Sequence, residues 1–345
     1  MTKSIAPKLS VVITCYNYGA FVADAINSIL QQNATVDIVV VDDCSKDNSR
    51  DIIASFGDQI TAVFQDVNQG HGGGFNKGFS VTNPDTDLIM FLDADDFLLP
   101  GAVDTIVGNY QADIVMYHYR MRYADEGGAL AGFHPAMRIA LGQGDISKQL
   151  RETGRYNGQI TSGLVFSRQT LEKVMPMDPE SYRQGGDGYL SAVVPLYGAC
   201  QSFDAAISGY RLHGMQHSKF QAAYAKRARW RIGHDEERYH SIRHHSEKLG
   251  LSVSDDLSDR DPSHLEERLV SVLFDPENHP IAGDTVTSLS AKIANVQVSQ
   301  KAFWKAFSIA PSSFKRIMMQ WRIDPLTRPH VLVKVGRFAR TMLSR

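Results

Sequence analysis

The stretch LIMFLDADD (residues 88–96) decides the fold of this chain, because five apolar residues run directly into a segment with three acids. LSVVIT (9–14) and DIVVVD (37–42) have the same form, a short apolar run that leads into polar residues. Near-continuous apolar runs separated by segments with helical spacing are typical of parallel strands buried on both faces. Further runs at 60–64 and 114–119 extend the pattern. The sequence therefore predicts an α/β domain with a mainly parallel sheet and helices on both faces.

Carboxylates follow the second and fourth of these strands, at the sheet edge where open α/β folds bind their ligands. They are Asp42 and Asp43 after one strand, and Asp93, Asp95 and Asp96 after the other. Carboxylates gathered at one edge repel one another unless a cation or hydrogen-bond donors lie among them. An all-oxygen cluster selects Mg²⁺ or Mn²⁺, often together with substrate phosphates. The set predicts a divalent-metal and diphosphate site, whereas a single Asp at such a position can equally cap a helix.

The composition is that of a globular protein with an uneven charge distribution. With 43% hydrophobic and 21% charged residues the chain is neither disordered nor fibrous, and its 345 residues exceed one minimal domain. The net charge of −2 hides a split, because residues 301–345 carry ten Lys/Arg and one acid, whereas residues 1–300 carry 26 bases and 37 acids. Since the acidic part offers no basic surface, we expect no nucleic-acid partner.

Two regions are expected along the chain. Residues 1–217 hold the strand pattern, and residues 218–345 have a helical pattern with breaks at prolines. The three cysteines have no metal-ligand spacing and fit a reducing compartment. The sequence has no run of 18 apolar residues and no signal-like leader. These features predict a cytoplasmic protein, either soluble or held at the inner face of the membrane.

A glycine-rich stretch, NQGHGGGFNKG (68–78), lies between the third and fourth strands. It does not match the dinucleotide fingerprint, because Phe75 stands where the third Gly belongs. It does not match the P-loop either, because Gly-Lys-Ser/Thr is missing. Two interpretations stay open: glycine amides at a helix start that approach a nucleotide, or a flexible loop.

Taken together, these motifs resemble the nucleotide-binding half of the family 2 inverting glycosyltransferases, which have the GT-A fold. The resemblance covers residues 8–217 and rests on T-x-Y-N at 14–17, D-D-x-S at 42–45, the glycine-rich stretch and the D-x-D element at 93–95. It implies a GT-A nucleotide-sugar-binding and catalytic domain over residues 1–217. The implied reaction moves a sugar, with inversion, from a nucleotide diphosphate donor to a hydroxyl of a saccharide or lipid-linked acceptor. A UDP-sugar is the expected donor.

The resemblance also implies roles on the donor side. Thr14 and Tyr16 correspond to the residues that flank the nucleotide base, and Asp43 to the carboxylate that accepts a hydrogen bond from uracil. Asp93 corresponds to the acid near the ribose. Asn76 corresponds to the Asn of the glycine-rich donor-binding element.

Metal and base positions follow in the same way. Asp95 corresponds to the acid that binds Mg²⁺ or Mn²⁺, and His213 is expected to complete the metal shell or to touch a phosphate. Asp187 takes the Asp position of the family's Glu-Asp element at a helix start, where it is expected to act as general base; capping the helix is its alternative role. The chain departs from the family twice, because Phe75 replaces the usual Arg and Gly186 the usual Glu.

Two other classes of function stay open. A sugar nucleotidyltransferase shares the α/β layout and the acidic metal site. Its first strand would normally lead into a basic, glycine-rich triphosphate loop, and residues 14–19 contain no Lys or Arg. The departures at positions 75 and 186 leave room for a non-catalytic sugar-nucleotide-binding module.

The basic tail, residues 301–345, has two interpretations of its own. It holds two apolar stripes at helical spacing, Phe314, Ile317, Met318 and Trp321 in one and Val331, Val335, Phe338 and Met342 in the other. Interleaved Lys and Arg predict interfacial helices on an anionic membrane surface. Alternatively, the stripes pack on the body of the protein or on a second subunit, which would make a homo-oligomer.

Overall fold

The computed structural model describes residues 6–213 and 224–323, and the chain divides into two compact units. The first unit comprises Met1–Lys219 and Glu236–Leu257, and the second comprises Phe220–Asp235 and Ser258–Arg345. Helix α8 (Tyr224–Lys248) therefore contributes its first half to the second unit and its second half to the first. The predicted boundary at 217/218 lies close to the first change of unit, whereas residues 236–257 return to the first.

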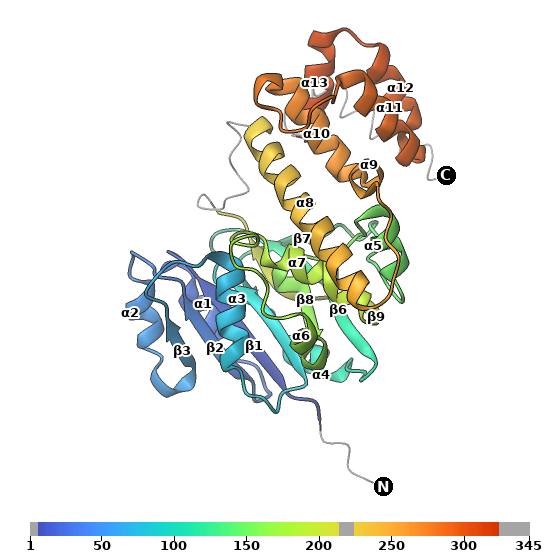
Figure 1. Cartoon of the computed structure of the whole chain (residues 1–345). Helices are drawn as coiled ribbons and strands as arrows, with labels where there is room; N and C mark the ends of the chain where they lie inside the picture. The colour runs from blue at the N-terminus through green and yellow to red at the C-terminus, as the bar shows by residue number, and fades with distance from the viewer. Residues whose placement is uncertain (1–5, 214–223, 324–345) are drawn as a thin grey trace, which may run out of the picture. The chain divides into compact units, whose positions relative to one another are not determined.

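A nine-stranded sheet forms the centre of the first unit (Figure 1). The strands follow the order β3-β2-β1-β4-β8-β6-β9-β5, and β7 pairs with β6. Their bounds are β1 Leu9–Cys15, β2 Asp37–Asp42, β3 Thr61–Phe64, β4 Leu88–Asp93, β5 Phe97–Leu98, β6 Ile114–Ala124, β7 Leu130–His134, β8 Leu164–Ser167 and β9 Ala199–Arg211. The first four strands in this order are parallel, as predicted. β6 and β9 are parallel as well, and β8, β7 and β5 join as antiparallel partners, so most register pairs of this mixed sheet are parallel.

Helices pack on both faces of this sheet, as predicted, because the strand side chains alternate between two cores. Val12 and Val41 point to the core that contains Phe75 of α3, whereas Val11 and Ile13 point to the core shared with α1. Figure 1 shows α3 lying across β1 and β2. The helices of this unit that precede α8 are α1 Val22–Leu30, α2 Ser49–Ala54, α3 Gly70–Val81, α4 Ala102–Gly108, α5 Ser147–Thr153, α6 Arg168–Val174 and α7 Gly186–Val193.

The second unit is helical, which confirms the prediction of a helical C-terminal region. Besides the first half of α8 it contains α10 Pro262–Phe274, α11 Val286–Val296, α12 Lys301–Ile309 and α13 Ser312–Ile323, and the short α9 Leu257–Arg260 begins at its border. Its core holds Trp304, Phe307 and Met319, which are fully buried. Within residues 6–213 and 224–323, no helix has both the length and the apolar character needed to cross a bilayer.

The first apolar stripe of the basic tail is only partly buried. Met319 of α13, a neighbour of the predicted stripe, faces the core of the second unit. Phe314 and Ile317 of the stripe are 44% and 40% exposed, and Ile309 at the end of α12 is 86% exposed. The second stripe, at positions 331–342, lies outside the described residues.

Replacing Gly78 by Ala should destabilise the first unit. Gly78 lies on α3, and an added Cβ would come 2.2 Å from Cγ1 of Val12 and 3.2 Å from Cγ2 of Val41. Both valines are fully buried in the sheet, so an overpacking cost of about 1–3 kcal/mol should exceed the usual gain from Gly to Ala in a helix. Urea unfolding measures the effect. Gly108→Ala in α4, where the added Cβ meets nothing within 4 Å, is the control. Equal unfolding midpoints for both variants would contradict this packing.

Candidate active site

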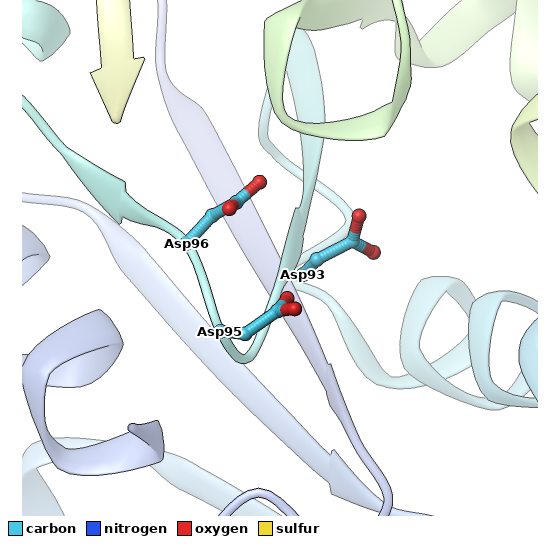
Figure 2. Close-up of side chains that lie close together, drawn as sticks. All are labelled: Asp93, Asp95 and Asp96. Carbon is cyan, nitrogen blue, oxygen red and sulfur yellow. The ribbon is translucent and has the colours of Figure 1, made fainter. Parts of the chain in front are cut away.

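Three carboxylates gather at the end of β4, as the sequence predicts. Asp93 is the last residue of the strand, and Asp95 and Asp96 lie on the turn that follows it (Figure 2). One oxygen from each carboxylate lies within 4.8 Å of the others. Thr14 of β1 is the register partner of Asp93, and its carbonyl oxygen accepts the N–H of Ala94 at 3.3 Å. Asp93, Asp95 and Asp96 are called the acid triad from here on. Thr14 and the acid triad therefore share one edge of the sheet.

The backbone of this acidic turn is held by Arg211, a buried residue at the end of β9. Its guanidinium Nε donates to the carbonyl oxygen of Asp95 at 2.9 Å, and its backbone N–H donates to Oδ1 of Asp96 at 3.0 Å. The same guanidinium reaches a carboxylate oxygen of Asp24 at 3.1 Å. The hydroxyl of Ser162 accepts the N–H of Asp93 at 3.2 Å. Arg211 and Ser162 are scaffold residues of the site that have no role in the sequence prediction.

Burial and mutual repulsion make the charged triad costly. Burial raises the pKa of Asp95, and the charge of Asp93 adds to the increase. Burial, followed by the charges of Asp95 and Asp93, raises the pKa of Asp96 well above its usual value. His213 is buried beside them, with Nε2 2.9 Å from Oδ2 of Asp95. Crowded carboxylate oxygens next to an imidazole form a donor set that fits Mg²⁺ or Mn²⁺.

Asp43 and Asn76 are both engaged by the protein itself. Asp43, just past β2, accepts backbone N–H groups from Gln69 and Gly70 at 2.7 Å each and the side-chain amide of Gln65 at 2.8 Å. Asn76 of α3 donates to the carbonyl oxygen of Met177 at 2.7 Å and accepts its N–H at 2.9 Å. The side-chain amide of Asn76 therefore fastens α3 to the segment that leads to α7. Its predicted contact with the donor stays a prediction.

Thr14 and Tyr16 differ in accessibility. Thr14 is half-buried, and a Cβ added at Gly74 of α3 would come 3.1 Å from its Cγ2. Tyr16 follows the end of β1 and is 42% exposed, so its ring is accessible to a ligand. Their predicted contact with a nucleotide base remains a prediction.

The glycine-rich stretch is explained by a close approach of two backbones. The N–H of His71 donates to the carbonyl oxygen of Arg183 at 2.8 Å, and the N–H of Gly72 donates to that of Tyr182 at 2.9 Å. A Cβ on Gly70, which has a φ of +77°, would come 2.4 Å from the Arg183 oxygen, and one on Gly72 would come 2.7 Å from the Tyr182 oxygen. Side chains at these two positions would separate the start of α3 from the loop before α7. The stretch is therefore neither a phosphate cradle nor a flexible loop at this end.

This contact brings Asp187 toward the acid triad. Asp187 lies in the first turn of α7, one residue after the helix begins at Gly186, and is half-buried. Between it and the triad lies His71, with Nε2 3.3 Å from Oδ1 of Asp93 and Nδ1 3.2 Å from the N of Gly186. Burial alone would lower the pKa of His71, but the negative charges of Asp93, Asp187 and Asp95 outweigh it and raise the pKa. His71 thus contacts Asp93 through one ring nitrogen and, through the other, Gly186, the residue that precedes Asp187.

The sequence prediction did not include His71, although a signal was present. His71 is the only residue with a side chain in the run Gly70–Gly74. A segment that packs closely on these glycines is therefore expected to contact its imidazole. Phe75, at the usual Arg position, is fully buried and stacks on Phe91 with ring centroids 3.9 Å apart. It cannot contact a diphosphate. Lys77, the other candidate cation of this helix, is exposed.

Part of the chain matches a known protein family. Residues 10–174 match the model of glycosyl transferase family 2. The chain carries a family 2 glycosyltransferase domain. The chain is 36% identical over 219 residues to an uncharacterized glycosyltransferase of Nostoc sp. The aligned stretch covers 60% of this chain and 65% of that protein. It is 32% identical over 104 residues to the GalNAc(5)-diNAcBac-PP-undecaprenol beta-1,3-glucosyltransferase of Campylobacter jejuni, which covers 29% and 34%. The matched part of the chain therefore spans less than two thirds of the length of these curated relatives.

Solved structures with a similar fold include two glycosyltransferase complexes. One is S. aureus TarS 1–349 in complex with UDP-GlcNAc, with a TM-score of 0.51, 15% identity, and coverage of 84% of this chain and 79% of that chain. The other is the mannosyltransferase PcManGT from Pyrobaculum calidifontis in complex with GDP-Man and Mn²⁺, with a TM-score of 0.50, 13% identity, and coverage of 88% and 84%. At these identities the similarity concerns the fold alone, and it confirms the predicted GT-A type.

Removing the charge of Asp96 should stabilise the metal-free protein at neutral pH. Because the folded protein holds this proton to a higher pH than the unfolded chain does, the free energy of unfolding falls as pH rises above about 4, the ordinary carboxyl pKa. Asp96→Asn keeps the Oδ1 acceptor for Arg211 and lacks the charge. Urea unfolding in a chelator should show a higher midpoint than wild type at about pH 7.5 and a smaller loss between about pH 5 and pH 7.5.

The control for this measurement is Asp58→Asn, since Asp58 is an exposed surface acid. It should leave both the midpoint and its pH dependence unchanged. A lower midpoint for Asp96→Asn at about pH 7.5 would mean that the carboxylate charge is compensated within the protein.

Proposed function

We propose that this protein is an inverting, metal-dependent glycosyltransferase that moves a sugar from a UDP-sugar to a hydroxyl of a saccharide or lipid-linked acceptor. The observation that carries the proposal is that His71, within the residues that match family 2, lies between Asp93 of the acid triad and the start of α7, where Asp187 follows just beyond the matched residues. A half-buried carboxylate near a cluster of buried acids suits a reaction that needs one group to take a proton and others to hold a diphosphate.

Nucleotide-sugar binding is supported by the edge of the sheet and by the similar folds. TarS and PcManGT are in complex with UDP-GlcNAc and GDP-Man. On this chain, Tyr16 offers an accessible ring for the nucleotide base. Asp43 already accepts three N–H groups, and a carboxylate has about four lone-pair sites, so it retains room for one further donor such as the N–H of uracil.

A divalent cation fits the acidic turn. Asp95, with His213 beside it and Asp93 within reach, would hold Mg²⁺ or Mn²⁺. When bound, the cation stabilises the negative charge that develops on the diphosphate leaving group. The Mn²⁺ in the PcManGT complex supports this assignment. Arg211 serves the same site by fixing the backbone of the turn through Asp95 and Asp96.

Asp187 supplies the proton chemistry in this proposal. Its carboxylate takes the proton of the acceptor hydroxyl as the hydroxyl oxygen attacks the anomeric carbon. The bond between that carbon and the diphosphate oxygen breaks, and the nucleoside diphosphate leaves with the electron pair. Attack from the side opposite the leaving group inverts the configuration. The N-cap position of α7 is held by Gly185, so Asp187 stands inside the first turn rather than at the cap.

Replacing Asp187 by Asn should abolish most turnover and leave donor binding intact. General-base assistance contributes typically about 10²–10⁴-fold, and Asn keeps the size of the side chain without its proton affinity. The measurement is nucleotide release and sugar transfer with Mn²⁺ over a panel of nucleotide sugars, combined with calorimetric UDP binding.

Glu180→Gln provides the matched control, because Glu180 is an exposed carboxylate in the loop before α7. Wild-type transfer rates for Asp187→Asn would remove Asp187 as the base. Binding of UDP without any transfer by the wild-type protein would instead favour a non-catalytic sugar-nucleotide-binding module.

We place the enzyme at the cytoplasmic face of a membrane, with an anionic lipid surface as its partner. Ile309, Phe314 and Ile317 expose apolar side chains, and Lys305 and Arg316 beside them are also exposed. Exposed apolar groups among bases suit the boundary between lipid headgroups and acyl chains. The C. jejuni relative is named for a transfer to an undecaprenol-linked saccharide, which supports a lipid-linked acceptor.

Vesicle flotation tests this location, with point variants rather than a truncation. Removing residues after 300 would take Trp304, Phe307 and Met319 out of the core, whereas Ile309→Ser, Phe314→Ser and Ile317→Ser combined change only exposed groups. Wild type should float with phosphatidylglycerol vesicles and lose binding at high salt, because each base contributes about 1 kcal/mol near the surface.

The triple variant should float much less, and Val298→Ser, at a position 70% exposed, should behave as wild type. Equal flotation of wild type and triple variant would refute the membrane surface. A concentration-dependent dimer of the wild type that is lost in the triple variant would assign the same face to a second subunit.

A further inference from the structure

The two departures from the family pattern lie against each other in space. A Cβ on Gly186 would come 3.3 Å from Cδ2 of Phe75 and 3.3 Å from Cα of Gly72. Phe75 is itself fixed, because it is fully buried between Phe91, 3.9 Å away, and His71, 4.2 Å away between ring centroids. The ring that replaces the usual Arg thus lies so close to position 186 that a side chain there would need it to shift by a few tenths of an ångström. The two changes are one packing arrangement.

This packing leaves the first N–H of α7 facing an imidazole. The N of Gly186 lies 3.2 Å from Nδ1 of His71, and a backbone N–H can only donate, so Nδ1 must be the acceptor. The ring proton then sits on Nε2, which faces Oδ1 of Asp93 at 3.3 Å. With the proton on Nε2, the ring accepts the Gly186 N–H at Nδ1 and turns an N–H toward the Asp93 carboxylate, a charge contact without hydrogen-bond geometry.

We propose that His71 is a positioning residue for sugar transfer, which ties the start of α7, and with it Asp187, to the end of β4. The proposal rests on the function proposed above, because it assigns to His71 the spacing between the general base and the donor-side acids. Three contacts hold the imidazole: the backbone bond from His71 to Arg183, the edge of Phe75, and the Gly186 N–H. His71 takes no proton from the substrate; it acts through the position of Asp187.

Three variants of His71 separate its two ring nitrogens. Asn places a side-chain oxygen near the position of Nδ1 and so keeps an acceptor for Gly186. Gln places its amide near the position of Nε2, keeping a donor toward Asp93 without the acceptor. Phe keeps the ring and removes both nitrogens. His240→Asn is the control, because His240 is exposed on α8.

Kinetics give the first readout. His71→Asn should keep kcat within a few-fold of wild type, whereas His71→Gln and His71→Phe should lower kcat roughly 100-fold at nearly unchanged donor KM, the scale expected for a misplaced catalytic group. Unchanged kcat in His71→Phe would overturn the proposal. So would a raised donor KM at constant kcat, which would make His71 a donor contact, or an equal loss of kcat in His71→Asn and His71→Phe.

Amide exchange at Gly186 gives a readout that needs no turnover. Hydrogen exchange resolved by NMR should show the Gly186 amide protected in wild type and in His71→Asn, and exchanging at least tenfold faster in His71→Gln and His71→Phe. Equal protection in all four proteins would overturn the bridge. If wild type transfers no sugar, the function proposed above fails in the kinetic assay, while the exchange data still decide whether His71 holds the start of α7.

Discussion

The site depends on one contact between backbones, where the start of α3 meets residues 182–183. Two N–H groups, from His71 and Gly72, donate directly to carbonyl oxygens of the loop before α7. Such an approach is open only to glycine on one side, since any Cβ at Gly70 or Gly72 would lie within 2.7 Å of those oxygens. Asn76 adds a second fastening through Met177. By this contact the loop before α7, the helix that carries the proposed base Asp187, is held against the start of α3.

The second constraint is electrostatic. Asp95 and Asp96 are buried beside Asp93, and both burial and mutual repulsion raise their pKa values. Arg211 holds the shape of the turn with two hydrogen bonds. Its buried guanidinium donates to the carbonyl oxygen of Asp95, and its backbone N–H donates to Oδ1 of Asp96. A site built in this way is costly without a cation and becomes stable with one. Stability and donor binding are therefore expected to depend on the same ion.

The parallel part of the fold was predictable because its strands are continuous apolar runs. β2 begins and ends where DIVVVD does, and β4 and β1 extend one residue further than predicted. The antiparallel additions were not predictable. β5 has only two residues, and β7 lies in a glycine-rich segment without apolar alternation, so their pairing is set by β9 and β6 rather than by local pattern. Residues 236–257 belong to the first unit, and the charged sequence of this part of the chain gives no local pattern that predicts it.

The site was predicted in part. The acids and Asp187 stood at strand and helix ends, positions that sequence reveals. Asp43 and Asn76 show the limit of a sequence motif. The motif identifies the residue but not the groups of the protein, here the N–H of Gln69 and the carbonyl of Met177, to which its side chain is already hydrogen-bonded. The packing of Phe75 against Gly186 also couples the residues that these two positions can hold. A side chain at 186 would crowd the Phe75 ring, and a charged Arg at the fully buried position 75 would need a partner to offset its desolvation. The residues at 75 and 186 should therefore covary among relatives.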